Sequence, residues 1–227
     1  MHELIEQFTL LDRYAFGWFL LSWIGYSLIA DQTRLNQYSI STTMAKYRRE
    51  WIQQMLRREI RIIDAQLHSN MLHNIGFFAT TTILAIGGSL ALLGATDQAI
   101  LVMEDLPYME TNNRVQWEFK ILLLVLIFIY AFFKFAWAFR LANWNSILFG
   151  AAPPIGTDDV TANDYVDKAT RLNRLSSNHF NRGIRAYFFA LAELSWFLDA
   201  RLFIISTGLV LMVLINREFR TRFILQL

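Results

Sequence analysis

Three side chains that commonly ligate metals lie close together in the sequence: Asp64, His68 and His73. Asp64 and His68 are four residues apart, so a helix would place both on one face. His73 lies five positions beyond His68, which is about 140° further round a helix. The three side chains therefore do not converge without a further helix, and the sequence has no H-E-x-x-H motif. We expect no metal site and no cofactor, with these residues at an aqueous boundary.

Four charged residues lie inside or beside long apolar stretches: Lys134, Glu193, Asp199 and Arg201. An ionisable group at bilayer depth is costly, so such groups indicate a buried charge pair or a polar path. One hypothesis pairs Lys134 with Glu193 or Asp199. The alternatives are that Lys134 extends its ammonium to the membrane surface or that the charges pair within one helix.

A second polar group, His179, Asn181, Arg182 and Arg185, immediately precedes an apolar stretch. Two arginines and a histidine could bind an anionic headgroup, a carboxylate or a phosphate. The alternative is that these residues are ordinary positive charges flanking a membrane span. The chain has no Cys, and no nucleotide-binding or hydrolase motif occurs in it, so no residue is predicted to be catalytic.

The composition indicates which elements must position these residues. Hydrophobic residues make up 55% of the 227-residue chain, charged residues only 18%, and the mean hydropathy is +0.30. These values exclude disordered, collagenous and disulfide-scaffold proteins. They favour an all-α, polytopic membrane protein, which we treat as a single membrane domain over residues 1–227.

Apolar stretches predict four transmembrane helices at about 14–30, 75–96, 119–139 and 200–216. The fourth lies at the end of an apolar region, 186–215, that is too long for one straight crossing. We expect an approach helix through Leu198 and then the crossing. Whether this span is tilted, broken or re-entrant is left open, and no Gly or Pro near Asp199 marks a turn.

Loop charges orient the spans. Basic residues dominate the segments before the second span and after the third, whereas the loop between these spans is acidic. Its acidic residues are Asp97, Glu104, Asp105, Glu110 and Glu118. The positive-inside rule therefore places both basic segments in the cytoplasm and both termini outside. The membrane that we expect is the inner (plasma) membrane of a bacterium. The C-terminal tail, with Arg217, Arg220 and Arg222, is an exception to this assignment.

Cytoplasmic helices are predicted at about 40–74 and 161–185. The first has an apolar stripe of Ile52, Leu56, Ile60, Ile63 and Leu67 at helical spacing, and no Gly or Pro separates it from the second span. This long amphipathic helix could rest on lipid headgroups, or pack against the later segment or another subunit. Thr161 and Asp164 resemble a capping box that opens the second helix.

The second span contains a ladder of small residues, which we call the small-residue ladder: Gly87, Gly88, Ala91 and Ala95. Small residues allow helix backbones to approach closely in lipid. The ladder therefore predicts close helix packing, either within the chain or with a second copy.

Five strings in the sequence resemble a family of bacterial and plant membrane proteins, the domain of unknown function 599 (DUF599). They are AKYRREW (45–51), RIIDAQ (61–66), FFATTTIL (77–84), YAFFKF (130–135) and HFNRGIRAY (179–187). The resemblance covers nearly the whole chain, in order. The resemblance implies a four-helix integral membrane protein and no particular activity.

These observations leave three functional hypotheses. The first is a self-associating, non-enzymatic membrane module, such as a channel or transporter for small or anionic solutes. The second is an accessory subunit of a larger membrane complex. The third is a membrane enzyme acting on lipid or quinone through His179, Arg182 and Arg185. The expected partners are membrane lipids and protein subunits, and not nucleic acid.

Overall fold

The computed structural model describes residues 7–32, 39–104 and 113–220, and 89% of it is helical, with no strand in these ranges. This confirms the all-α prediction. Asp105, Glu110 and Arg222 lie outside the described residues. The helices in chain order are α2 (Leu10–Gln32), α3 (Ile40–Leu56), α4 (Ile62–Gly94), α5 (Thr96–Glu104), α6 (Arg114–Gly150), α7 (Asp159–Leu194), η2 (Ser195–Phe197), α8 (Ala200–Ile215) and η3 (Asn216–Arg220).

Three of the described helical segments are long and apolar enough to cross a membrane: Ile62–Gly94, Arg114–Gly150 and Ala200–Glu218. They correspond to the second, third and fourth predicted spans, the second of which was predicted to end two residues beyond Gly94. Helix α2 contains the first predicted span but is not among them. Its interior includes Trp18, Trp23 and Tyr26, whose rings are large but only weakly hydrophobic on a hydropathy scale. A crossing by α2 is therefore taken up below as a proposal.

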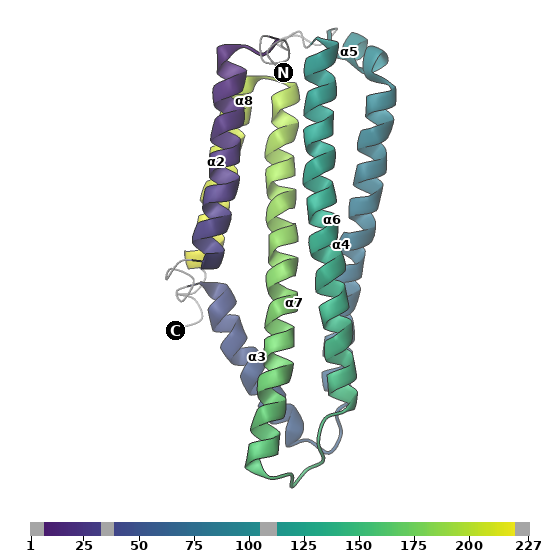
Figure 1. Ribbon diagram of the computed structural model, residues 1–227, viewed down its shortest axis with the longest axis vertical. Coiled ribbons are helices and arrows are strands. Elements are labelled where there is room, and N and C mark those ends of the chain that lie inside the picture. The colour runs from purple at the N-terminus through teal and green to yellow at the C-terminus, as the bar shows by residue number, and fades with distance from the viewer. Residues whose placement is uncertain (1–6, 33–38, 105–112, 221–227) are drawn as a thin grey trace.

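Helices α2 and α8 lie side by side and run in the same direction (Figure 1). Near one end, the Trp196 indole donates to Asp12 Oδ1 at 2.8 Å, and near the other, Tyr26 Oη donates to the Leu214 carbonyl at 3.2 Å. Helix α7 runs antiparallel to both, because Arg185 contacts Asp31 at the end of α2 whereas Phe189, further along α7, contacts Phe19 in the middle of α2.

The chain reverses direction between α7 and α8. The expected approach helix and crossing are therefore two antiparallel helices. The turn consists of η2 followed by Asp199, whose carboxylate accepts hydrogen bonds from the backbone amides of Arg201 and Leu202. An N-cap carboxylate satisfies free amides at a helix start, so this reversal needs neither Gly nor Pro.

Buried aromatic rings from α2, α6, α7 and α8 form the main core, in which Phe19, Phe135, Phe189 and Phe203 are fully buried. Helices α6 and α7 pack tightly at Gly183, where an added Cβ would lie 2.5 Å from a ring carbon of Phe135. Burying one such ring contributes about 1.5–3 kcal/mol, so this aromatic core is a major source of stability.

The predicted amphipathic helix over 40–74 is interrupted. Helix α3 ends at Leu56, and α4 begins at Ile62 and returns beside α6 (Figure 1). The Arg61 guanidinium donates to the carbonyls of Ala152 and Pro153, at 3.3 and 2.8 Å, and so holds the intervening turn against the α6–α7 connection. The prediction that this helix runs continuously into the second span is wrong.

The apolar stripe of α3 packs against α7. Ile52 and Met55 are buried with Tyr165, Val166 and Ala169. From the turn onward the residues of the expected stripe no longer pack against α7, since Ile60 and Ile63 are exposed.

Helix α7 begins at Asp159, with the Asp158 carboxylate accepting from the Thr161 amide at 2.9 Å. The cap therefore lies three residues before the predicted Thr161. The helix also continues to Leu194, nine residues beyond the predicted end at 185.

Candidate functional site: an arginine-lined cavity beside α7

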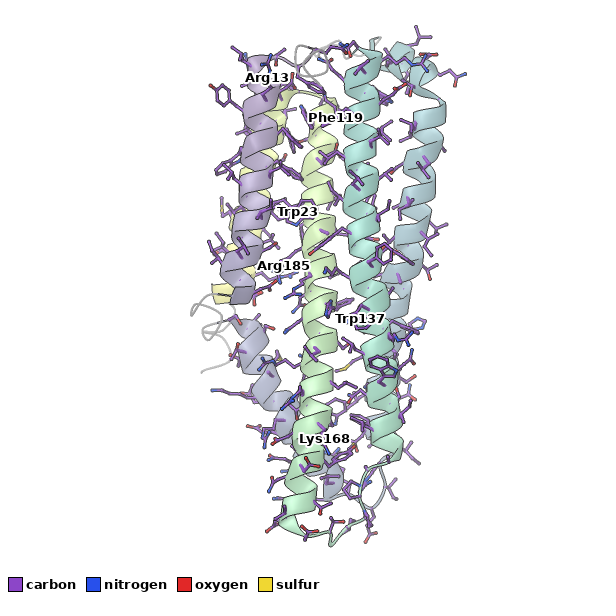
Figure 2. The ribbon with its side chains drawn as sticks, in the orientation of Figure 1. Arg13, Trp23, Phe119, Trp137, Lys168 and Arg185 are labelled. Atoms are coloured by element: carbon purple, nitrogen blue, oxygen red, sulfur yellow. The ribbon has the colours of Figure 1, made fainter. Side chains whose placement is uncertain are left out.

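Arg182 and Arg185 share one acidic partner. The Asp31 carboxylate, at the end of α2, accepts from Arg182 Nε at 2.8 Å and from Arg185 Nη2 at 2.6 Å. Figure 2 shows Arg185 between α2 and α7. The Arg185 side chain is only 10% exposed, so these ion pairs are largely shielded from water. The acid is more than 150 residues away in sequence, and nothing local to α7 reveals it.

The predicted set of His179, Asn181, Arg182 and Arg185 therefore does not form one open anion site. The His179 ring lies 6.4 Å from the Trp137 ring, between centroids. Burial, followed by the charges of Arg182 and Lys134, lowers the pKa of His179, with Asp31 acting in the opposite direction. Asn181 instead lines a groove between α7 and α3.

The charges near the apolar spans are also distributed differently from the hypothesis. Lys134 Nζ lies 4.9 Å from the centroid of the Tyr130 ring, and no ion pair joins it to Glu193 or Asp199 among the described residues. Glu193 is fully buried, and Lys120 is the cation that interacts with it electrostatically. Asp199 caps α8, and Arg201 is exposed.

Asp64, His68 and His73 do not converge. Asp64 Oδ1 accepts from the Trp51 indole at 2.7 Å and from Arg58, which fixes the α3–α4 turn. His68 Nε2 bonds to the Ala142 carbonyl at 3.0 Å, whereas His73 is exposed. The described residues contain no group of three ligands that could hold a metal ion.

The small-residue ladder faces outward. Gly87, Gly88 and Ala91 are exposed. An added Cβ at Gly87 or Gly88 would meet nothing within 4 Å. Within the described part of the chain, these residues are therefore not the contact that holds α4 to its neighbours.

The sequence prediction missed a cavity of about 250 Å³ lined by α3, α4, α6 and α7, which we call the inner cavity. Its polar lining includes Arg48, His68, Asn145, Asn173 and Ser177. No Asp or Glu is among the described residues that line it. The inner cavity therefore presents a cation and several uncharged polar groups without a carboxylate.

Unsatisfied polar atoms mark the inner cavity. Asn145 is completely buried, and neither its Oδ1 nor its Nδ2 has a hydrogen-bond partner in the described structure. His68 is also buried, and its Nδ1 has no partner. A buried polar group without a hydrogen bond costs about 1–3 kcal/mol. Groups of this kind identify a place where a ligand could supply the missing partners.

Arg48 is the cation of this cavity. Within the described residues it makes no ion pair or hydrogen bond, and burial lowers the pKa of its guanidinium. Arginine nevertheless stays protonated in proteins, because its ordinary pKa is so high. A partly buried, uncompensated guanidinium is suited to binding a carboxylate or phosphate through two parallel hydrogen bonds.

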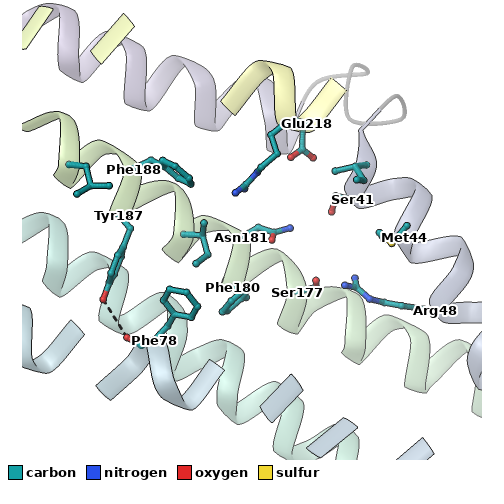
Figure 3. A pocket seen from close by; sticks show the side chains of 14 residues that line it. Ser41, Met44, Arg48, Phe78, Ser177, Phe180, Asn181, Tyr187, Phe188 and Glu218 are labelled. Atoms are coloured by element: carbon teal, nitrogen blue, oxygen red, sulfur yellow. Dashed lines mark hydrogen bonds between the residues drawn. The ribbon is translucent and has the colours of Figure 1, made fainter. Parts of the chain in front are cut away.

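Helix α3 positions Arg48. Residues 48, 52 and 55 have the i, i+4, i+7 spacing of one helical face, and Ile52 and Met55 are buried against α7. Figure 3 shows Arg48 extending from α3 toward Ser177 on α7. This shared face was the signal in the sequence that could have distinguished Arg48 from the other basic residues of its segment.

The inner cavity adjoins a larger hollow of about 620 Å³ between α3, α7 and the end of α8, which we call the outer groove (Figure 3). Arg48, Phe78, Ser177 and Phe180 line both. A ligand at Arg48 therefore has access to both hollows.

Comparison with known proteins identifies the family. Residues 14–223, nearly the whole chain, match the family described as protein of unknown function, DUF599. No curated protein and no solved structure matches the chain. The chain therefore belongs to the DUF599 family.

Proposed function

We propose that the protein is a non-enzymatic, multi-pass membrane module that binds a small anionic solute in the inner cavity. The observation that carries this proposal is the combination of uncompensated Arg48 with the fully buried, unpaired amide of Asn145. An anion would neutralise the guanidinium and could accept from the Asn145 amide group. Binding at this position would serve a channel or transporter for anionic solutes.

The membrane topology is part of the proposal. Helices α2, α4, α6 and α8 are the four predicted crossings. The C-terminal half of α7 lies antiparallel to α2 and α8, and its Phe189 belongs to the same aromatic core as Trp196 in the following η2. We therefore infer a fifth crossing by α7. The start of the chain then lies outside a bacterial inner membrane, with the basic segments in the cytoplasm.

The fifth crossing also accounts for the C-terminal arginines. With an odd number of crossings, Arg217 at the end of α8 lies on the same side as the basic segments, as the positive-inside rule requires. A reporter fused after residue 227 tests this. Cytoplasmic reporter activity supports five crossings, and external activity supports four.

Self-association through the small-residue ladder is a second proposal, favoured by its outward-facing glycines. Because the chain contains no Cys, Gly88→Cys would give a single thiol on this face. We expect disulfide-linked dimers of Gly88→Cys but not of Leu209→Cys, an exposed position on α8. Co-release of heavier subunits from native membranes would instead favour an accessory role in a larger complex.

Anion binding is tested by the thermal stability of the purified protein in amphipol. A ligand that binds only the folded state raises stability by about 2.7 kcal/mol at 100 times its Kd. We expect phosphate or a short carboxylate to raise Tm. Arg48→Met should abolish the increase, whereas Arg57→Met, an exposed arginine at the end of the same helix, should retain it.

Two results would contradict the proposal. If no anion raises Tm, or if Arg48→Met responds as the unaltered protein does, the inner cavity is not an anion site. Transport is tested separately, by anion flux in proteoliposomes. Recovery of a chemically changed lipid or quinone would support the enzyme hypothesis.

A further inference from the structure

The outer groove differs chemically from the inner cavity that it adjoins. Its lining includes Ile184, Phe188 and Leu191 on α7 and Ile40 and Met44 on α3, with Arg217 and Glu218 after the end of α8. The apolar side chains suit a hydrocarbon chain and not a small hydrophilic anion. The two hollows meet at Arg48, so the cation lies where the amide-bearing lining of the inner cavity adjoins these apolar walls.

The outer groove follows α7 toward the proposed membrane. Ser177, which lines both hollows, and Leu191 are 14 residues apart, which corresponds to about 21 Å along a helix. Arg185, paired with Asp31 at the end of α2, lies between them in the sequence and marks the proposed membrane boundary. The groove therefore begins at Arg48 on the cytoplasmic side and extends past this boundary to Leu191.

We propose that the ligand is an anionic amphiphile supplied by the membrane, with its phosphate or carboxylate head at Arg48 and its alkyl chain in the outer groove. This inference rests on the proposed anion binding at Arg48. The charge of Arg48 selects an anionic head, the unpaired Asn145 amide supplies a second polar contact, and the apolar α7 wall accommodates the chain. The protein thus binds an amphiphile that spans its membrane boundary.

The test compares ligands that share one head and differ in chain length. Inorganic phosphate, butyl phosphate and octyl phosphate are titrated onto the protein in amphipol, below the micelle concentration of octyl phosphate. Each methylene buried in an apolar groove increases affinity up to about fourfold. We therefore expect octyl phosphate to bind at least tenfold more tightly than butyl phosphate, within the ceiling of about 250-fold that four fully buried methylenes would give.

Variants separate the two compartments. Leu191→Ser and Ile184→Ser should reduce the gain from chain length and leave binding of inorganic phosphate intact. Leu191 is 62% exposed, so we expect Leu191→Ser to fold. Leu191→Ser therefore provides the test even if Ile184→Ser does not fold. Leu209→Ser, on the outer face of α8, should change neither property and controls for adsorption of the chain to apolar surfaces.

The outcomes distinguish the two proposals. Equal, Arg48-dependent affinity for all three phosphates overturns the amphiphile inference and leaves anion binding in place. Chain-length dependence that persists in both Leu191→Ser and Arg48→Met reports adsorption elsewhere and also overturns the inference. If none of the phosphates binds, the proposed function fails, and the inference fails with it.

Discussion

Arginine side chains lie in two regions beside α7, and the two regions differ in whether an acidic side chain compensates the positive charge. On one side, Arg182 and Arg185 share the carboxylate of Asp31. On the other, Arg48 reaches α7 from α3 and has no acidic partner among the described residues. Both regions look alike in the sequence, since each is a basic cluster next to an apolar stretch.

The difference separates a structural role from a binding role. A buried ion pair that is complete joins two helices, and removing one partner leaves an uncompensated charge. A guanidinium without a partner contributes no such contact and is costly to bury. We therefore assign the Asp31 cluster to the architecture of the bundle, and the Arg48 region to a ligand that supplies the missing charge.

Asp31→Asn is the substitution with the largest expected effect on stability. It leaves Arg185 without a counter-charge at a position where the side chain is 10% exposed, and the loss should be about 3 kcal/mol. Thermal unfolding measures it. Asp167→Asn is the matched control, because its pair with Arg49 is exposed and should contribute less than about 1 kcal/mol. Equal effects of the two substitutions would contradict the structural role of Asp31.

Gly183→Ala tests whether packing, as well as charge, holds the region around the paired arginines. The added methyl group would collide with the fully buried Phe135 ring, so we expect a loss of about 1–3 kcal/mol. Gly208→Ala in α8 meets nothing within 4 Å and should be neutral or stabilising by up to about 1 kcal/mol. An unchanged Tm for Gly183→Ala would mean that α6 and α7 are further apart than described.

Asn145→Leu should stabilise the protein, in contrast to the two preceding substitutions. It replaces a buried amide that lacks hydrogen bonds by an apolar side chain of similar volume, so the free energy of unfolding should rise by about 1–2 kcal/mol. Binding of phosphate should weaken at the same time. Destabilisation by this substitution would show that the amide has a partner within the protein, and would weaken the case for a ligand.

The smallest expected effect is a pH dependence from His179, beside the paired arginines. Burial, Arg182 and Lys134 lower its pKa from the ordinary 6.5, so the folded state binds this proton less readily than the unfolded state. Stability from this residue is therefore complete above about pH 6.5 and decreases as the pH falls below that value. Thermal unfolding at about pH 7.5 and about pH 5.5 should show a smaller difference for His179→Gln than for the unaltered protein. An identical difference would exclude this contribution.

The sequence was sufficient to predict the helical class, because apolar runs such as 75–96 and 119–139 have the length and composition of membrane helices. It did not predict the reversals at 57–61 and 195–199. Neither contains Gly or Pro. The first is held by contacts of Arg61 with residues more than 90 positions away, and the second by the side chain of Asp199.

The candidate site was harder to predict, because it is recognised by a counter-charge and hydrogen bonds that its residues lack. Arg182 and Arg185 were recognised as anion-binding candidates, but the distant Asp31 occupies them. In the sequence, Arg48 is one of several basic residues in the segment before the second span. That it lacks a counter-charge, and that Asn145 lacks hydrogen bonds, follows from the packing of α3, α4, α6 and α7 and from no local pattern.

The most direct test of the account measures both stability and phosphate binding in Arg48→Met and Asp31→Asn. We expect Arg48→Met to keep or raise Tm and to lose at least tenfold in affinity for phosphate, while Asp31→Asn lowers Tm. If Arg48→Met instead unfolds as readily as Asp31→Asn, or binds phosphate with unchanged affinity, Arg48 is not the anion-binding residue and the central claim is wrong.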